Sequence, residues 1–176
     1  YVGEIHTNEK ELQDAKIILE NHLNFALQYV EEIWEAMGVK DKHIYISRNR
    51  TLLLYADLLR RLGDSKEGLN YKFQALDLAE SKLLARDIAY VYQDIGLYYH
   101  LWVKDYENAI KYYKDAINIF ETDLILKKEY LYLITLDGIA SSYWFLDQAD
   151  LGYPYSKKAA DISLKRLYGQ IDVRQL

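Results

Sequence analysis

The sequence predicts an all-α fold, a right-handed α-α superhelix (solenoid) of about four helical hairpins. Small and apolar residues recur at helical spacing with a period of about 42 residues. With 8 glycines and one proline, the 176-residue chain has too few turn-forming residues for many strands. Hydrophobic residues make up 51% of the chain, so we expect it to bury a core of its own.

The clearest repeat is a small or apolar residue followed by others four and seven positions later. Successive copies lie 42, 41 and 43 residues apart. The four copies are Ala26, Val30, Ile33; Gly68, Lys72, Ala75; Ala109, Tyr113, Ala116; and Gly152, Ser156, Ala159. This spacing puts each copy on one helical face, where small side chains let a neighbouring helix approach closely.

A second helix with its own small residue precedes three of these copies. The small residues are Ala56, Gly96 and Ala140, which are 40 and 44 residues apart. Each stands between bulky residues in the pattern bulky-x-x-apolar-small-x-x-bulky. Each repeat is therefore predicted to be a hairpin of two closely packed helices.

The order of the helices follows from these patterns. We expect them at 8–22, 24–37, 43–61, 65–81, 83–102, 105–121, 126–146 and 150–167. Glycine and aspartate in the turns at 62–65, 103–106 and 146–149 suit helix caps. We predict a single domain over 1–176, with repeats at 8–37, 43–81, 83–121 and 126–167 and a tail at 168–176 that caps the last repeat or leads into a further domain. The start at Tyr1 rather than Met suggests a piece of a larger protein.

One segment resembles a known repeat. Residues 92–120 read YQDIGLYYHLWVKDYENAIKYYKDAINIF, which is similar to the tetratricopeptide repeat, with one extra residue in its internal turn. The stretches 50–80 and 134–167 resemble weaker copies, and 8–37 a degenerate one. The usual proline after the second helix is absent, and the period exceeds the family's usual length of about 34 residues. The resemblance is to long-period variants found in bacterial sensors and regulators, including the peptide-sensing Rap and PlcR type.

Composition argues against several functions. The net charge of -5 gives no general attraction to phosphate, so we expect no contact with nucleic acid. No apolar run is long enough to span a membrane, and we expect no membrane contact by this segment. The absence of cysteine excludes disulfides and thiolate metal sites but leaves the compartment open, cytoplasmic or periplasmic.

No catalytic motif is present. The sequence has no GxGxxG, P-loop, GxSxG or HExxH, and its four histidines never stand four residues apart. We therefore predict no enzyme, no cofactor and no metal site. A helical hydrolase or transferase with unrecognised catalytic groups stays as a rival, which only a pocket of converging carboxylates or histidines would support.

The resemblance implies a ligand groove, because the first helices of stacked hairpins line the concave side. The positions that line it in the family carry over to Arg50, Leu53, Asp57, Arg60 and Arg61; to Tyr90, Gln93, Leu97, His100 and Leu101; and to Ile134, Asp137, Ser141, Trp144 and Phe145.

Two interpretations of these residues are open. In the first, the three arginines hold a carboxylate of a peptide, Gln93 and Asp137 read its main chain, and Trp144 and Phe145 form an apolar anchor. In the second, Arg60 and Arg61 only pair with Asp57 and Asp64 near the end of their helix.

The 18 tyrosines are expected to be mostly core. The tyrosines at packing positions are Tyr55, Tyr92, Tyr99, Tyr113 and Tyr143. Four others could be exposed or could line contacts between hairpins, namely Tyr98, Tyr112, Tyr153 and Tyr155.

The function predicted overall is protein or peptide binding, as the sensing or regulatory domain of a bacterial signalling or transcription regulator. The alternative is a self-association module, for example a homodimer.

Overall fold

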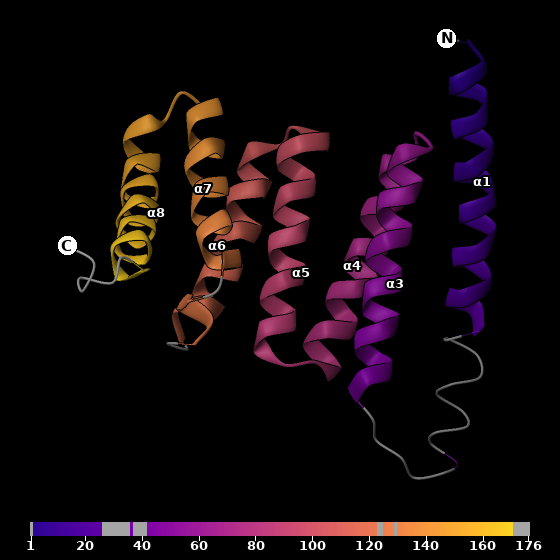
Figure 1. Ribbon diagram of the computed structural model, residues 1–176, viewed down its shortest axis with the longest axis horizontal. Coiled ribbons are helices and arrows are strands. Elements are labelled where there is room, and N and C mark those ends of the chain that lie inside the picture. The colour runs from indigo at the N-terminus through magenta and orange to yellow at the C-terminus, as the bar shows by residue number, and fades with distance from the viewer. Residues whose placement is uncertain (1, 26–35, 37–41, 123–124, 129, 171–176) are drawn as a thin grey trace. The chain divides into compact units, whose positions relative to one another are not determined.

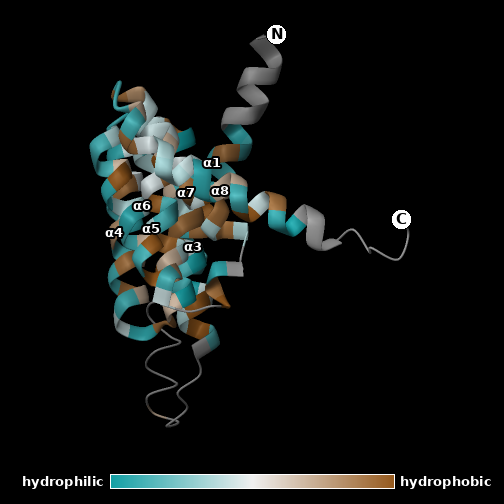
Figure 2. Cartoon of the chain, turned by 90° about the vertical axis from the view of Figure 1, so that its left-hand side faces the viewer, coloured by the Kyte–Doolittle hydropathy of each residue, from teal (hydrophilic) through white to brown (hydrophobic). Residues whose placement is uncertain are grey.

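The computed structural model describes residues 2–25, 36, 42–122, 125–128 and 130–170, which form helices joined by short turns (Figure 1). The helices in chain order are α1 (Val2–Phe25), α3 (Lys42–Arg61), α4 (Ser65–Lys82), α5 (Ala85–Tyr98), the π-helix η2 (Tyr99–Val103), α6 (Tyr106–Thr122), the 3-10 helix η3 (Leu126–Lys128), α7 (Tyr130–Phe145) and α8 (Ala149–Gln170). Hydrophobic and hydrophilic residues alternate along these helices, as the brown and teal bands of Figure 2 show.

The chain divides into two compact units, and each is described by itself. The first unit is Tyr1–Val91 and the second is Tyr92–Leu176, so the boundary falls inside α5. The prediction of one domain over 1–176, with its repeat boundaries, stays a prediction. None of the described helices has both the length and the apolar character of a membrane-spanning segment.

The predicted hairpin turns are present. Gly63 has a positive φ of 93° at the end of α3, a backbone conformation that glycine adopts without steric cost. The Asp64 carboxylate then accepts a hydrogen bond from the Glu67 amide at 3.1 Å and caps α4. In the second unit Lys104 and Asp147 take the left-handed conformation at the two corresponding turns.

The first helix differs from the prediction. A break near residue 23 is wrong, because α1 runs without interruption from Val2 to Phe25. The sequence from residue 4 to residue 37 contains no glycine or proline that would end a helix there. The expected second helix at 24–37, with its copy Ala26, Val30, Ile33, lies largely outside the described residues.

Two later helices also differ from the prediction. The expected helix 83–102 begins at Ala85 and ends in the π-helix η2, where the Asp105 amide donates to the Tyr99 carbonyl at 3.2 Å. The wider π turn takes up the extra residue that the sequence places in this turn. The expected helix 126–146 is α7 preceded by the separate 3-10 helix η3.

The first unit has a core between α3 and α4. Ala56, Ala75 and Ala79 are completely buried, and Leu59 and Tyr55 are nearly so. The Asn49 side chain donates to the Ala75 carbonyl at 2.5 Å. Small residues at the contact therefore bring the two helices close together, as the repeat predicts.

The second unit is centred on Tyr113 of α6. A Cβ atom at Gly96 of α5 would lie 2.6 Å from Cδ1 of this ring, and one at Gly138 of α7 would lie 2.6 Å from Cζ. Both distances are far below van der Waals contact, so the ring fits only because both positions are glycine. Gly96 was expected at such a contact, whereas Gly138 was not.

The tyrosines separate into buried rings and stacked rings. Tyr55 and Tyr113 are buried as predicted, and Tyr98 and Tyr132 are buried as well. The other three tyrosines expected in the core, Tyr92, Tyr99 and Tyr143, are partly exposed and lie against the rings of other tyrosines. Tyr153, which the sequence leaves open, is exposed.

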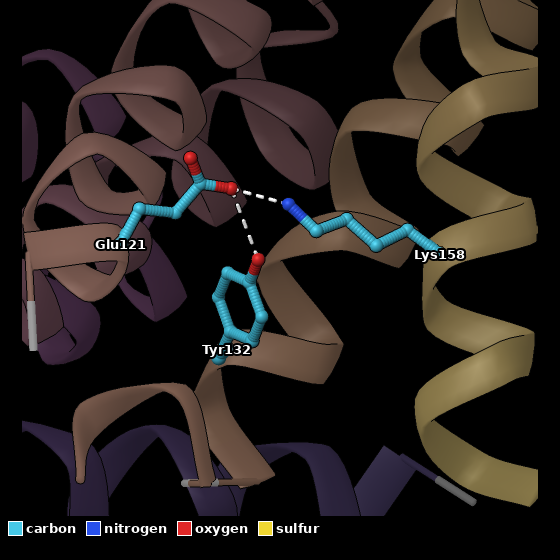
Figure 3. A network of polar contacts seen from close by, with 3 residues as sticks. All are labelled: Glu121, Tyr132 and Lys158. Atoms are coloured by element: carbon cyan, nitrogen blue, oxygen red, sulfur yellow. Dashed lines mark hydrogen bonds and ion pairs between the residues drawn. The ribbon is translucent and has the colours of Figure 1, made fainter. Parts of the chain in front are cut away.

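A polar network ties α6, α7 and α8 together at one end of the second unit (Figure 3). Glu121 accepts hydrogen bonds from the Tyr132 hydroxyl at 3.0 Å and from the Lys158 ammonium group. Elsewhere on the same helices the Lys114 ammonium group donates to the Tyr143 hydroxyl at 2.8 Å. These contacts fix the relative positions of three helices, and so position the exposed face of α7.

Candidate functional site: exposed faces of α3 and α7

Four side chains form an exposed row on α3. Arg50, Leu54, Asp57 and Arg61 are spaced by four, three and four residues, which places them on one helical face. Arg50 and Arg61 are exposed, Leu54 is 58% exposed and Asp57 is partly exposed. We call this row the α3 stripe. Leu54 was missed by carrying over family positions, but the same spacing rule starting from Arg50 identifies it.

The Asp57 carboxylate is held from behind by a buried lysine. Lys72 of α4 is only 1% exposed, and its Nζ lies 3.1 Å from Oδ1 of Asp57. Lys72 occupies the repeat position at which the second unit has Tyr113. A buried ammonium group needs a nearby anion, so this ion pair fixes the Asp57 side chain while leaving part of it open to solvent.

The ion pair between Asp57 and Lys72 concerns the second interpretation, in which Arg60 and Arg61 only pair with Asp57 and Asp64. Asp57 pairs with Lys72, and Asp64 caps α4. Arg50 and Arg61 form no ion pair with any residue that the structure describes. Two exposed guanidinium groups therefore stand on the α3 stripe with their donors available to a ligand.

Arg60 and Leu53 do not share this face. Ten residues along a helix correspond to a rotation of about 80° between Arg50 and Arg60, and Arg60 is partly buried. Leu53 is buried in the core of the first unit. The group of three arginines expected from the sequence therefore reduces to a pair.

A second exposed row lies on α7. Tyr130, Ile134, Asp137, Ser141 and Trp144 are spaced by four, three, four and three residues along one face. Tyr130 and Trp144 are 67% and 70% exposed, and Asp137 and Ser141 are exposed too. We call this row the α7 stripe. Tyr130 is the member that family positions did not supply.

Asp137 is the one charged residue among the five that form the α7 stripe. It forms no hydrogen bond or ion pair within the described ranges. Partial removal from water raises the pKa of its carboxyl above the ordinary value. A cation brought by a ligand would pair with the ionised carboxylate and offset the cost of that desolvation.

His100 lies beside the end of α7 in a ring cluster. Its ring packs edge-on against Tyr106 and Phe145, at 5.4 and 5.5 Å between centroids, while Tyr106 and Phe145 stack at 4.7 Å. The Ser142 hydroxyl donates to the Gly138 carbonyl at 2.7 Å, so Nδ1 of a neutral His100, 2.8 Å from Oγ, is the protonated nitrogen. Burial lowers the pKa of His100.

The remaining residues of the expected groove fall in different settings. Tyr90 is exposed on the part of α5 in the first unit, whereas Gln93, in the second unit, is only 5% exposed. Gln93 thus offers little surface to a ligand. Leu97 and Ile134 are partly buried, and Leu101 and Phe145 are exposed.

The described side chains bring no group of three or more histidines or carboxylates together at metal-binding distance.

Comparison with known proteins identifies the repeat. Residues 47–122 match the family model of the tetratricopeptide repeat. No curated protein matches the chain. Among solved structures, the apo form of RapI superposes with a TM-score of 0.71 at 16% identity, covering 93% of this chain and 53% of that one.

Two further structures have the same fold. BtubC (BKLC) from P. vanneervenii gives a TM-score of 0.64 at 20% identity, covering 89% of this chain and 61% of that one. The repeats of a putative kinesin light chain from Podosopora anserina give 0.64 at 14% identity, covering 93% and 72%. The chain spans only part of RapI and BtubC, and identities this low show the fold alone.

These matches confirm an all-α helical-repeat solenoid. Proteins built from such repeats generally serve as scaffolds for contacts between proteins and are generally not enzymes. Residues 47–122 therefore match the tetratricopeptide repeat, and the fold around them is similar to that of solved proteins with such repeats.

Proposed function

We propose that the chain binds extended peptide segments of partner proteins on exposed faces of its first helices, each face within one unit, as the sensing or regulatory domain of a bacterial signalling or transcription regulator. The observation that carries the proposal is the α3 stripe, where Arg50 and Arg61 are exposed and form no ion pair within the described part of the chain. Exposed arginines are poor packing residues but good ligands for carboxylates.

The spacing of the α3 stripe suits an extended peptide. Arg61 lies eleven residues after Arg50 on α3, which is a rise of about 16 Å along the helix axis. About five residues of an extended peptide cover that distance. Leu54 lies between the arginines and offers apolar contact. The Asp57 carboxylate, held by Lys72, can accept hydrogen bonds from main-chain amides of the peptide. The favoured ligand has two anionic groups about 16 Å apart on the same side of the extended peptide, with an apolar residue between them.

The regulatory role has separate support. It rests on the resemblance of the repeat to the peptide-sensing Rap type and on the likeness in fold to RapI. That role requires a neighbouring domain that responds when a peptide binds. We further propose that this segment contacts neither nucleic acid nor membrane.

The first experiment probes an array of synthetic 12-residue peptides with the labelled chain. We expect binding to acidic peptides that the double variant Arg50→Ala, Arg61→Ala weakens by at least about tenfold. The matched control, Lys157→Ala with Lys165→Ala, removes the same charge from exposed positions of α8 and should leave binding unchanged. Both variants should melt at the same temperature as the parent. An array without sequence-dependent binding would overturn the proposal.

Self-association is the second candidate. The observation in its favour is exposed apolar surface on α8, where Leu151, Tyr153 and Leu164 are 56%, 64% and 49% exposed. Sedimentation equilibrium separates the two functions: a concentration-dependent dimer without peptide affinity supports assembly, and a monomer that binds peptide supports recognition.

A further inference from the structure

We propose that the α7 stripe takes a peptide carrying a lysine or arginine three residues away from a bulky apolar residue, with Asp137 binding the cation and Trp144 the apolar side chain. This inference rests on the proposed function and adds the chemical class of the ligand at this site. The ligand class differs from the acidic one assigned to the α3 stripe.

The negative charge of Asp137 favours a lysine or arginine side chain of the peptide. Asp137 lies on an exposed helical face and makes no ion pair or hydrogen bond with any described residue. The neighbours along the stripe, Ile134 and Ser141, carry no charge. An ammonium or guanidinium group is the complement of an isolated carboxylate, and an anionic peptide would be repelled there. Partial burial raises the pKa of Asp137, and a cationic ligand would favour its ionised form.

The apolar half of the site is an exposed ring, Trp144, beside a second ring that is held by packing. Trp144 is 70% exposed and the adjacent Phe145 is 56% exposed. Phe145 is fixed by stacking on Tyr106 and by the edge of His100. An exposed tryptophan offers a large apolar surface with few rotatable bonds, and the packed Phe145 ring extends that surface.

The distance between the two halves sets the ligand's spacing. Asp137 and Trp144 are seven residues apart on one face of α7, a rise of about 10.5 Å. In a polyproline II segment, residues three apart point to the same side and lie about 9.3 Å apart. A basic and an apolar side chain at that spacing therefore reach Asp137 and Trp144 together. The Ser141 hydroxyl, between them, is placed to bond to the peptide main chain.

The test measures binding of a fluorescein-labelled peptide, Ser-Pro-Arg-Pro-Ser-Trp-Pro-Ser, to the whole chain by fluorescence anisotropy. We expect Asp137→Asn to weaken binding by about tenfold and Trp144→Ala by at least as much. Asp161→Asn is the matched control, because it removes one exposed carboxylate from α8, and it should have no effect. Since Asp137 is exposed, its substitution should leave the fold intact, which circular dichroism checks.

A charge exchange gives the sharper result. The peptide with Glu in place of Arg should bind the parent poorly, and the variant Asp137→Arg should bind that peptide in preference to the original one. A peptide in which Arg and Trp are adjacent should bind at least about fivefold more weakly than the original. Equal binding of the Arg and Glu peptides, or an unchanged affinity in Asp137→Asn, would overturn the inference.

The outcome separates this inference from the proposed function. If acidic peptides bind through Arg50 and Arg61 while the Arg-Trp peptide does not bind, only the assignment of the α7 stripe fails. If neither kind of peptide binds, peptide recognition itself is rejected.

Discussion

The ring of Tyr113 occupies the space that a side chain at Gly138 would need. Cζ and Cε2 of the ring lie 2.6 and 2.8 Å from the ideal Cβ position of Gly138, and Gly96 faces another part of the same ring at 2.6 Å. Tyr113 is 1% exposed, so its ring is enclosed by protein and has no way out to solvent. Two glycines on α5 and α7 therefore accommodate one large side chain of α6.

Replacing Gly138 by alanine should destabilise the second unit. Alanine gains about 1 kcal/mol in helix propensity over glycine, but forcing a methyl group into a filled core costs about 1 to 3 kcal/mol. Because Tyr113 is confined between two helices, we expect a net loss of about 1 kcal/mol in urea denaturation. Ser141→Ala, an exposed change on the same helix, is the control. The loss should shrink in a Tyr113→Leu background, and an undiminished loss there would contradict the explanation.

Asp57→Asn should cost more stability than Lys72→Met. The first change leaves a buried ammonium group without this carboxylate, whereas the second replaces the buried lysine by an apolar side chain of similar length. Asp57 is partly exposed, so water limits the loss for Asp57→Asn to about 1 kcal/mol. Asp77→Asn on the exposed side of α4 is the control. Denaturation curves that rank the two variants in the opposite order would show that Lys72 is needed for more than pairing Asp57.

The Glu121 network should make stability fall in acid. The hydrogen bond from Lys158 lowers the pKa of Glu121 below its ordinary 4.5, helped by the Tyr132 hydroxyl. A lowered carboxyl pKa adds stability that is present above about pH 4.5 and is lost as the pH falls through the folded value. The exposure of the pair keeps the contribution below about 1 kcal/mol.

The measurement compares the parent with Glu121→Gln in urea between neutral pH and pH 3. The parent should be the more stable of the two at neutral pH, and the difference should vanish in acid. Asp161→Asn, an exposed change in the middle of α8, should follow the parent. The pKa of Lys158 is raised, so its contribution should be lost only in strong alkali. A difference that does not depend on pH would contradict the role of ionised Glu121.

His100 should titrate below its ordinary pKa of 6.5, because burial disfavours the charged ring. The unfolded chain then binds more protons than the folded chain just below pH 6.5, so stability should fall as the pH drops through that region. Proton NMR of the ring measures the pKa directly. The shifts should also show Nδ1 as the protonated nitrogen of the neutral ring. A pKa of 6.5 or higher, or protonation at Nε2, would contradict the arrangement with Ser142.

Helices and hairpin turns follow from the sequence because they depend on local patterns. The period of about 42 residues and the pair Gly63, Asp64 predict where α3 ends and α4 begins, and the structure agrees. The extra residue near Val103 is also visible in the sequence, although its form as a π-helix is not. The break expected in α1 is wrong because no residue there disfavours helix.

The tertiary structure decides which side chains reach solvent and which residues pair with one another. The adjacent leucines 53 and 54 look alike in sequence, yet only Leu54 reaches solvent, since a turn of 100° per residue separates the core side of α3 from its open side. The partner of Asp57 is Lys72, fifteen residues away and across a hairpin. A sequence pattern fixes which side chains share a helical face, but what covers that face depends on how neighbouring helices pack. Desolvation and ion pairing are properties of that packing.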